Sequence, residues 1–174
     1  MGKHKDNVVC GKAIHEISKG NTEALSVIYD CMARLIFSTA YAVTGNYTDA
    51  EDVLQETMIE VIRYSSSYQE GSNARAWILA MARHRSIDII RKRKLQIPLE
   101  AAKAVELADT SSDNSAREVF ELLESLETEE KQLILYRLYA GLSYSDISEV
   151  MGASVYAVQK RYQRVLKKLK KYYE

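Results

Sequence analysis

The sequence predicts an all-α protein made of two small helical domains that a flexible linker joins. Hydrophobic residues make up 47% of the 174 residues, which is enough to form packed cores. The chain contains one proline and seven glycines, so long segments are free of helix-breaking residues. In these segments apolar residues recur at steps of three and four, the spacing that places them on one face of a helix.

The first predicted helix lies within residues 22–46. Thr22 is placed to cap its start, and Gly45 and Asn46 interrupt its periodicity. The apolar positions expected on its buried face are Leu25, Ile28, Tyr29, Met32, Leu35, Ile36 and Ala40.

The second predicted helix, residues 49–64, has an apolar face and an acidic face. The apolar positions are Ala50, Val53, Leu54, Thr57, Met58, Val61 and Ile62. The side chains on or beside the opposite face are Asp52, Gln55, Glu56 and Glu60. Such a helix can dock on a basic or polar helical partner through charged hydrogen bonds. DNA would repel it.

Residues 65–73 form a predicted loop with serine and glycine, and residues 74–94 form a predicted helix that begins apolar and ends basic. Trp77 stands among Ile78, Leu79 and Met81. This setting is more typical of a core residue than of one that stacks on a base.

Residues 96–115 are predicted to be the linker, because they contain the only proline, weak periodicity and a run of small polar residues. This assigns residues 1–95 to the first domain and residues 116–174 to the second. Four short helices are expected in the second domain.

Residues 143–167 fit a helix-turn-helix, whose second helix enters the major groove of DNA. Ser143 and Ser154 are the predicted helix caps, and Gly152 fits the turn, where a positive φ suits glycine. The expected inward positions are Ile147, Val150 and Met151, followed by Val158, Tyr162 and either Val165 or Leu166. The expected outward positions are Tyr156, Gln159, Lys160, Gln163, Arg164 and Lys167. The alternative explanation is a solvated basic helix of an ordinary bundle.

The net charge of zero conceals a segregation of the two signs along the chain. Residues 49–70 carry six acids and one arginine, whereas residues 71–97 carry seven lysines or arginines and one acid. Residues 99–130 are again acidic, and residues 153–174 are basic. Two basic segments can therefore face phosphate while the acidic ones face another partner.

Cys10 and Cys31 form no CxxC pair and are expected to be reduced thiols, one in an amino-terminal tail and one half-buried. The sequence has no run of about 18 apolar residues and no secretory signal, so we expect a cytoplasmic protein without membrane insertion. It has no glycine-rich phosphate loop, metal-ligand spacing or nucleophile–base pair. We therefore expect no catalytic residue, no cofactor, no metal and no enzyme activity.

Three motifs together resemble the extracytoplasmic-function (ECF) class of sigma-70 RNA polymerase sigma factors. "TGNYTDAEDVLQET" is similar to the second-region segment that docks on the clamp helices of the polymerase largest subunit. "ARAWILAMARHRSIDIIRKRK" is similar to the helix that melts and reads the minus-ten promoter element. "GLSYSDISEVMGASVYAVQKRYQRVLKKL" is similar to the fourth-region helix-turn-helix that reads the minus-thirty-five element. The resemblance covers about residues 24–169 and implies a region 2 helical bundle followed by a region 4 domain.

The resemblance and the residue chemistry together give three candidate contact sets. The candidates for binding core polymerase, through its clamp helices and other subunits, are Asp49, Asp52, Gln55 and Glu56. The candidates for the melted minus-ten strand are Tyr68, Ser72, Asn73, Arg75, Arg83, His84, Arg91 and Arg93. The candidates for the minus-thirty-five duplex are Tyr156, Gln159, Lys160, Arg161, Gln163, Arg164 and Lys167.

The sequence departs from the family pattern at three places. His84 stands where the family usually has Asn, so it either alters a minus-ten contact, makes it depend on protonation, or is structural. Glu127 stands where a proline commonly begins the fourth region. "YAVQK" replaces the usual "GTVKS" in the recognition helix, which makes its DNA preference hard to transfer.

The resemblance implies an alternative sigma factor that binds core RNA polymerase and promoter DNA, with an anti-sigma factor as a further possible partner. The competing hypothesis is a stand-alone helix-turn-helix regulator whose first domain dimerises or senses a signal. Tight promoter binding without polymerase would favour that hypothesis.

Overall fold

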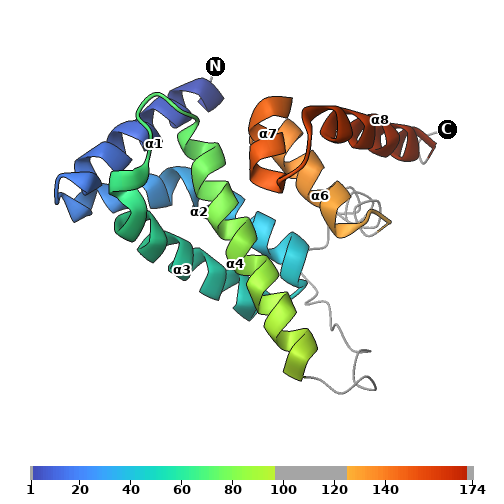
Figure 1. Cartoon of the computed structure of the whole chain (residues 1–174), viewed down its shortest axis with the longest axis horizontal. Coiled ribbons are helices and arrows are strands. Elements are labelled where there is room, and N and C mark those ends of the chain that lie inside the picture. The colour runs from blue at the N-terminus through green and yellow to red at the C-terminus, as the bar shows by residue number, and fades with distance from the viewer. Residues whose placement is uncertain (1, 97–124, 172–174) are drawn as a thin grey trace, which may run out of the picture.

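The computed structural model describes residues 2–96 and 125–171, with side chains described for residues 5–94 and 125–171. All regular elements in these two ranges are helical, which confirms the predicted all-α class (Figure 1). They are α1 (Gly2–Ser18), η1 (Thr22–Ala24), α2 (Leu25–Thr44), α3 (Tyr47–Tyr64), η2 (Ser65–Ser67), α4 (Ala74–Gln96), α6 (Thr128–Ile134), η3 (Leu135–Tyr139), α7 (Tyr144–Met151) and α8 (Val155–Lys171). None of the described helices is both long and apolar enough to cross a membrane.

Residues 2–96 form the amino-terminal bundle, in which α2, α3 and α4 pack against one another and α1 packs on α2 and α4. Helix α1 was not predicted. Its buried residues Cys10, Ala13, Ile14 and Ile17 recur at helical spacing. Cys10 is fully buried in this core, so its predicted place in a tail is wrong.

The ends of α2 and α3 are set by local backbone chemistry. Helix α2 ends at Thr44, and Gly45 caps it with a left-handed φ of 62°. The Asn46 side chain then caps α3 by accepting a hydrogen bond from the Asp49 N–H. The predicted Thr22 cap is wrong, because residues 22–24 form a 3-10 turn and no side chain caps α2. Tyr29 was expected on the buried face but is 52% exposed.

Residues 125–171 form the carboxy-terminal bundle of α6, η3, α7 and α8. The turn of the helix-turn-helix has the predicted geometry: Gly152 has a φ of 62°, and the Ser143 and Ser154 hydroxyls accept hydrogen bonds from the N–H groups of Asp146 and Ala157. Val158, Tyr162 and Val165 are buried, whereas Leu166 is exposed. The choice between Val165 and Leu166 is thereby resolved in favour of Val165.

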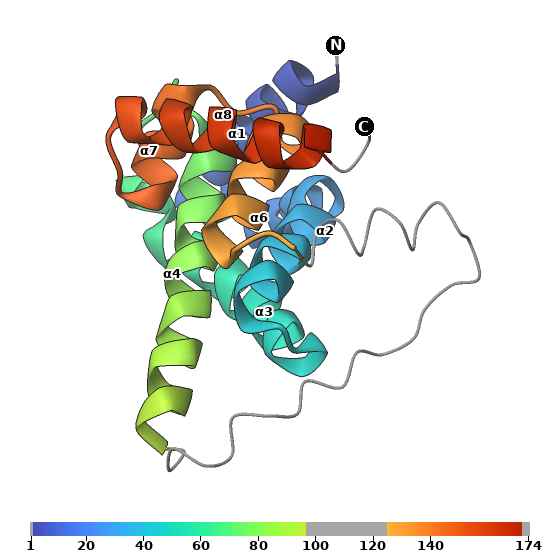
Figure 2. The same cartoon turned by 90° about the vertical axis from the view of Figure 1, so that its right-hand side faces the viewer.

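The two bundles pack against each other. Helix α4 contacts α7, and α2 contacts both α6 and η3. Figures 1 and 2 show the same arrangement from two sides, with the carboxy-terminal half of α4 projecting away from the second bundle. Buried residues of both bundles belong to one hydrophobic cluster. The predicted linker and the first helix expected after it lie mostly or wholly outside the described residues.

Candidate protein and nucleic-acid interfaces

Helix α3 presents three of the four candidate polymerase contacts to solvent. Asp52, Gln55 and Glu56 are all exposed, because the buried positions of α3 turn its other face to the core. Ile59, which is 47% exposed, and Tyr47, which is 58% exposed, lie on the same helix. The helix therefore offers acidic groups for hydrogen bonding together with apolar groups for contact area.

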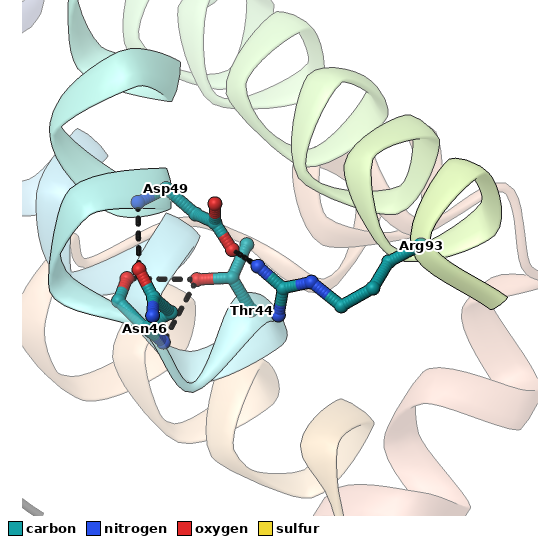
Figure 3. A network of polar contacts seen from close by, with 4 residues as sticks. All are labelled: Thr44, Asn46, Asp49 and Arg93. Carbon is teal, nitrogen blue, oxygen red and sulfur yellow. Dashed lines mark hydrogen bonds and ion pairs between the residues drawn. The ribbon is translucent and has the colours of Figure 1, made fainter. Parts of the chain in front are cut away.

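The fourth candidate, Asp49, is held at the start of α3 in a polar network (Figure 3). The Thr44 hydroxyl donates to the Asn46 carbonyl at 3.2 Å and accepts from the Asn46 N–H at 3.4 Å. The Asp49 carboxylate pairs with the Arg93 guanidinium at the far end of α4. The structure thus joins a residue predicted to bind polymerase to one predicted to bind DNA.

A second ion pair ties α3 to α4. The Arg85 guanidinium binds the Glu60 carboxylate, and Glu56 lies 3.9 Å from the same group. The hydrogen bond with Glu60 raises the pKa of Arg85 and outweighs the opposing effect of burial. Glu60, predicted beside the exposed acidic face, is therefore a half-buried tie between helices.

Arg75 and Arg83, which were predicted to bind the minus-ten strand, face the carboxy-terminal bundle. An Arg75 Nη donates to the Ala140 carbonyl at 2.8 Å, and the Arg83 Nε donates to the Gln132 Oε1 at 3.3 Å. Arg75 is only 6% exposed. In contrast, His84 and Arg91 are exposed, and Arg91 lies 3.9 Å from Asp88 in a solvated pair.

The loop before α4 is ordered by its own polar groups. The Tyr68 hydroxyl donates to the Ser72 carbonyl at 2.8 Å, and the Asn73 side chain accepts from the Ala76 N–H at 3.1 Å. The Tyr68 ring packs edge-to-face on Trp77 with centroids 5.4 Å apart. Trp77 is half-buried against the core, as its apolar neighbours predict. The capping role of Asn73 was missed, although an Asn directly before a helix is a standard cap signal.

Helix α8 keeps its predicted outward face open. The exposed residues of this face are Tyr156, Gln159, Lys160, Gln163, Arg164 and Lys167. The Lys160 ammonium lies 4.9 Å from the centroid of the Tyr156 ring. Arg161 is set apart from this group, because it is half-buried and pairs with Glu129 of α6.

Glu130 of α6 holds α8 through an ion pair with Lys168. Its carboxylate accepts hydrogen bonds from the Lys168 ammonium at 2.7 Å and from the Glu127 N–H at 3.0 Å. Burial alone would raise the pKa of Glu130, but these donors outweigh it, so the pKa lies below the ordinary value. Glu127 is the N-cap residue of α6, and its N–H group donates this hydrogen bond to Glu130.

Two family descriptions match the chain. "Sigma-70 region 2" matches residues 28–96, and "Sigma-70, region 4" matches residues 116–169.

Curated relatives match over most of their length. The chain is 26% identical over 168 residues to the ECF RNA polymerase sigma factor SigK of Mycobacterium ulcerans, which covers 90% of this chain and 89% of the relative. It is 30% identical over 154 residues to the ECF RNA polymerase sigma factor SigC of Mycobacterium tuberculosis, which covers 84% and 82%.

Two solved structures share the fold. CnrH, in complex with the cytosolic domain of CnrY, aligns with a TM-score of 0.68 and 21% identity over 93% of this chain and 95% of CnrH. The sigma factor RpoE of Bartonella quintana, in complex with the anti-sigma factor NepR, aligns with a TM-score of 0.67 and 20% identity over 83% and 92%.

Proposed function

The chain belongs to the ECF class of sigma-70 RNA polymerase sigma factors, and from this premise we propose how its surfaces divide the work of promoter recognition. As an alternative sigma factor it binds core polymerase and directs initiation at promoters that carry minus-ten and minus-thirty-five elements. The proposal concerns which residues make each contact. Its boundaries are those predicted from the sequence, with residues 1–95 as region 2, residues 96–115 as the linker and residues 116–174 as region 4.

The exposed face of α3 is the proposed polymerase-binding surface. Asp52, Gln55 and Glu56 supply the charged and polar groups, and Asp49 joins them when its pair with Arg93 opens. An acidic surface of this kind would be repelled by DNA and suits a partner with basic or polar helices.

The loop before α4 and the exposed side of α4 are proposed to hold the melted minus-ten strand. Tyr68, Ser72 and Asn73 offer a stacking ring and hydrogen-bonding groups for an unpaired base. The cationic side chains proposed to follow the strand on the exposed side of α4 are Arg91 and Arg93, with His84 beside them. Arg75 and Arg83 join them when their hydrogen bonds to Ala140 and Gln132 open. Melting then results from a higher affinity for unpaired bases than for duplex, without covalent chemistry by this chain.

The outward face of α8 is the proposed minus-thirty-five reader, and its exposure is the single observation that carries the assignment. Gln159, Lys160 and Gln163 lie on one side of a helix that starts directly after the Gly152 turn. Gln and Lys can bind base edges, while Arg164 and Lys167 suit phosphate. Arg161 joins them when its pair with Glu129 opens. Tyr156 lies at the start of the same face.

Two further expectations complete the proposal. The protein acts in the cytoplasm and has no catalytic activity of its own. The solved structures that share its fold are bound to CnrY and to the anti-sigma factor NepR, and we propose that an anti-sigma protein binds this chain as well.

The test is reconstitution of the purified chain with core polymerase on a genomic promoter library. Lys160→Glu should impair initiation at promoters that depend on the minus-thirty-five element, whereas Asp52→Arg should weaken polymerase binding. Lys171→Glu on the same helix as Lys160, and Glu23→Arg on η1, are the charge-matched controls. Normal polymerase affinity and transcription by both test variants would refute the assignment. Tight promoter binding without polymerase would instead support a stand-alone regulator.

A further inference from the structure

Helix α1 lies beside residues 68–73, the loop that is proposed to hold an unpaired minus-ten base and that is called the minus-ten loop below. It contacts η2 and α4, the two elements that flank this loop (Figure 1). The match to "Sigma-70 region 2" begins at residue 28, so α1 precedes the residues that the family description covers. None of the three proposed contact sets includes a residue of α1.

The first contact between α1 and this part of the chain is a hydrogen bond to the start of α4. The Asn7 Oδ1 accepts from the Arg75 N–H at 3.2 Å. The next N–H, that of Ala76, donates to the Asn73 side chain at 3.1 Å. Because the first N–H groups of a helix have no acceptor within the helix, Asn7 gives α4 a second cap that comes from α1. It thereby holds the point at which the minus-ten loop enters α4.

The second contact is a close approach of Gly11 to Tyr68. Asn7 and Gly11 are four positions apart, so they lie one turn apart on the same face of α1. A β-carbon at Gly11 would lie 3.3 Å from the Tyr68 hydroxyl oxygen, which is tighter than most contacts of a β-carbon. Glycine inside a helix is less favourable than alanine. Gly11 therefore makes α1 less stable, and the space left by its missing side chain admits the Tyr68 hydroxyl.

Tyr68 is also held on the sides that face away from α1. Its hydroxyl donates to the Ser72 carbonyl at 2.8 Å, and its ring packs edge-to-face on Trp77 with centroids 5.4 Å apart. A β-carbon at Gly11 would require Tyr68 to move by a few tenths of an ångström. A binding site keeps its function only when its groups stay within about 0.5 Å of the productive geometry. A displacement of this size therefore matters for base recognition, although it is small for packing.

We propose that Asn7 and Gly11 are positioning residues for the minus-ten loop, so that α1 sets how sharply the protein discriminates among bases at the position that this loop binds. The inference rests on the proposed function for its DNA ligand. Asn7 acts through the start of α4, and Gly11 acts through Tyr68. An unpaired base is read by hydrogen bonds to its edge and by stacking, and both depend on loop groups that are already in place.

Gly11→Ala is the decisive variant, because it favours the helix while it crowds Tyr68. One promoter from which the wild type initiates, with its minus-ten element randomised, serves as the template for the full chain and core polymerase. Sequencing of the transcripts measures base preference at each position. Gly11→Ala should weaken discrimination at one position by about fivefold, which is what one hydrogen bond to a base edge contributes. The exposed Val8→Ala on α1 is the control and should keep the wild-type preference.

The Tyr68→Phe background tests whether Gly11 acts through the Tyr68 hydroxyl. Tyr68→Phe removes the oxygen that a β-carbon at Gly11 would meet, so Gly11→Ala should cause no further loss of discrimination there. A loss as large as in the wild-type background would contradict this route.

Tryptophan fluorescence reports the position of the loop without DNA. Trp77 is the only tryptophan of the chain and contacts the Tyr68 ring. Gly11→Ala should change the Trp77 emission and its quenching by acrylamide, whereas Val8→Ala should change neither.

Asn7 provides a second test that does not alter Tyr68 directly. Asn7→Leu removes the acceptor for the Arg75 N–H and should weaken discrimination at the same position, while Asn7→Asp keeps an acceptor and should restore it. This pair replaces Gly11→Ala if circular dichroism shows that Gly11→Ala has lost helix.

The two proposals fail in different ways. A wild-type preference that survives in both Gly11→Ala and Asn7→Leu would refute the role of α1 and leave the proposed function standing. A wild-type chain that shows no base preference anywhere in the minus-ten element would refute the proposed function itself.

Discussion

Helices α4 and α8 are both basic, and both were predicted to bind nucleic acid. They differ in whether their cationic side chains bind other groups of the protein or face solvent. On α4, Arg75, Arg83, Arg85 and Arg93 all bind protein groups. On α8, the side chains of the outward face remain open to solvent. The number of cations in a segment therefore indicates an affinity for phosphate, but it does not indicate whether those side chains are accessible to phosphate.

The difference follows from where each helix lies. Helix α4 packs against α1, α2, α3 and α7, so its polar side chains meet acids and carbonyls on several sides. Helix α8 packs mainly on α6 and α7 through one stripe that includes Val158, Tyr162 and Val165. A helix that is buried along one stripe leaves its other side chains accessible to a ligand.

The largest expected effect comes from truncating matched leucines on the two helices. Leu79 of α4 is fully buried, whereas Leu166 of α8 is 43% exposed. Leu79→Ala should lower the free energy of unfolding by about 2–5 kcal/mol, and Leu166→Ala by less than about 1 kcal/mol. Urea unfolding followed by circular dichroism measures both, and equal losses would contradict the described difference in packing.

The next effect concerns Glu130, which holds α8 through Lys168. Glu130→Gln should destabilise the carboxy-terminal bundle by about 1–2 kcal/mol at neutral pH, because it weakens a charge-assisted hydrogen bond. Since the folded pKa of Glu130 is lowered from 4.5, its contribution is present above that pH and is lost as the pH falls through the folded pKa.

Urea unfolding at several pH values tests this linkage. The gap in stability between wild type and Glu130→Gln should shrink as the pH falls below about 4.5. The exposed Glu149→Gln on α7 is the control and should show no such convergence. If the difference in the free energy of unfolding between wild type and Glu130→Gln stays constant at acidic pH, the carboxylate of Glu130 does not stabilise α8 by its charge.

A smaller effect is expected from the open face of α8. Lys160→Gln should weaken binding to minus-thirty-five duplex about fivefold, and should reduce the slope of log affinity against log salt by about one. Lys171→Gln lies at the end of the same helix and should change affinity less. Titrations at several salt concentrations measure both, and identical behaviour would place the DNA contact elsewhere.

The smallest expected effect is a difference in stability cost between two ion pairs of α4 that differ in burial. The Glu60 side chain is 13% exposed and ties α3 to Arg85, whereas Asp88 is 51% exposed beside Arg91 on one helix. Glu60→Gln should cost about 0.5–1 kcal/mol, while Asp88→Asn should cost less than about 0.5 kcal/mol. Thermal unfolding of both variants at low and high salt provides the comparison, and a larger loss for Asp88→Asn would run against it.

Features that depend on neighbouring residues were predicted well. The Ser143 cap, the Gly152 turn and the inward positions Ile147 and Val158 follow from spacing and from backbone chemistry within a few residues. Helix α1 was missed even though its buried positions recur at helical spacing, because its apolar residues are diluted by lysines and glycines. The Thr22 cap was predicted wrongly because a 3-10 turn occupies residues 22–24 directly before α2, and such turns are frequent at helix starts.

Contacts between distant residues were not predictable from the pattern. Arg75 and Ala140 are 65 positions apart, and Arg83 and Gln132 are 49 positions apart. Their sequence neighbourhoods give no sign of the pairing. The same holds for Asp49 and Arg93, which were assigned to different partners and bind each other.

The sequence alone determined the helical class, the family, the helix-turn-helix and the separation of acidic from basic segments, because each depends on local spacing or on motifs read in order. Only the tertiary structure decided which of those charged side chains are accessible to a partner and which are bound to other groups of the protein. The partners of Arg75, Arg83 and Arg93 are whichever groups the packed helices bring within hydrogen-bond reach, and these groups lie 65, 49 and 44 positions away in the chain.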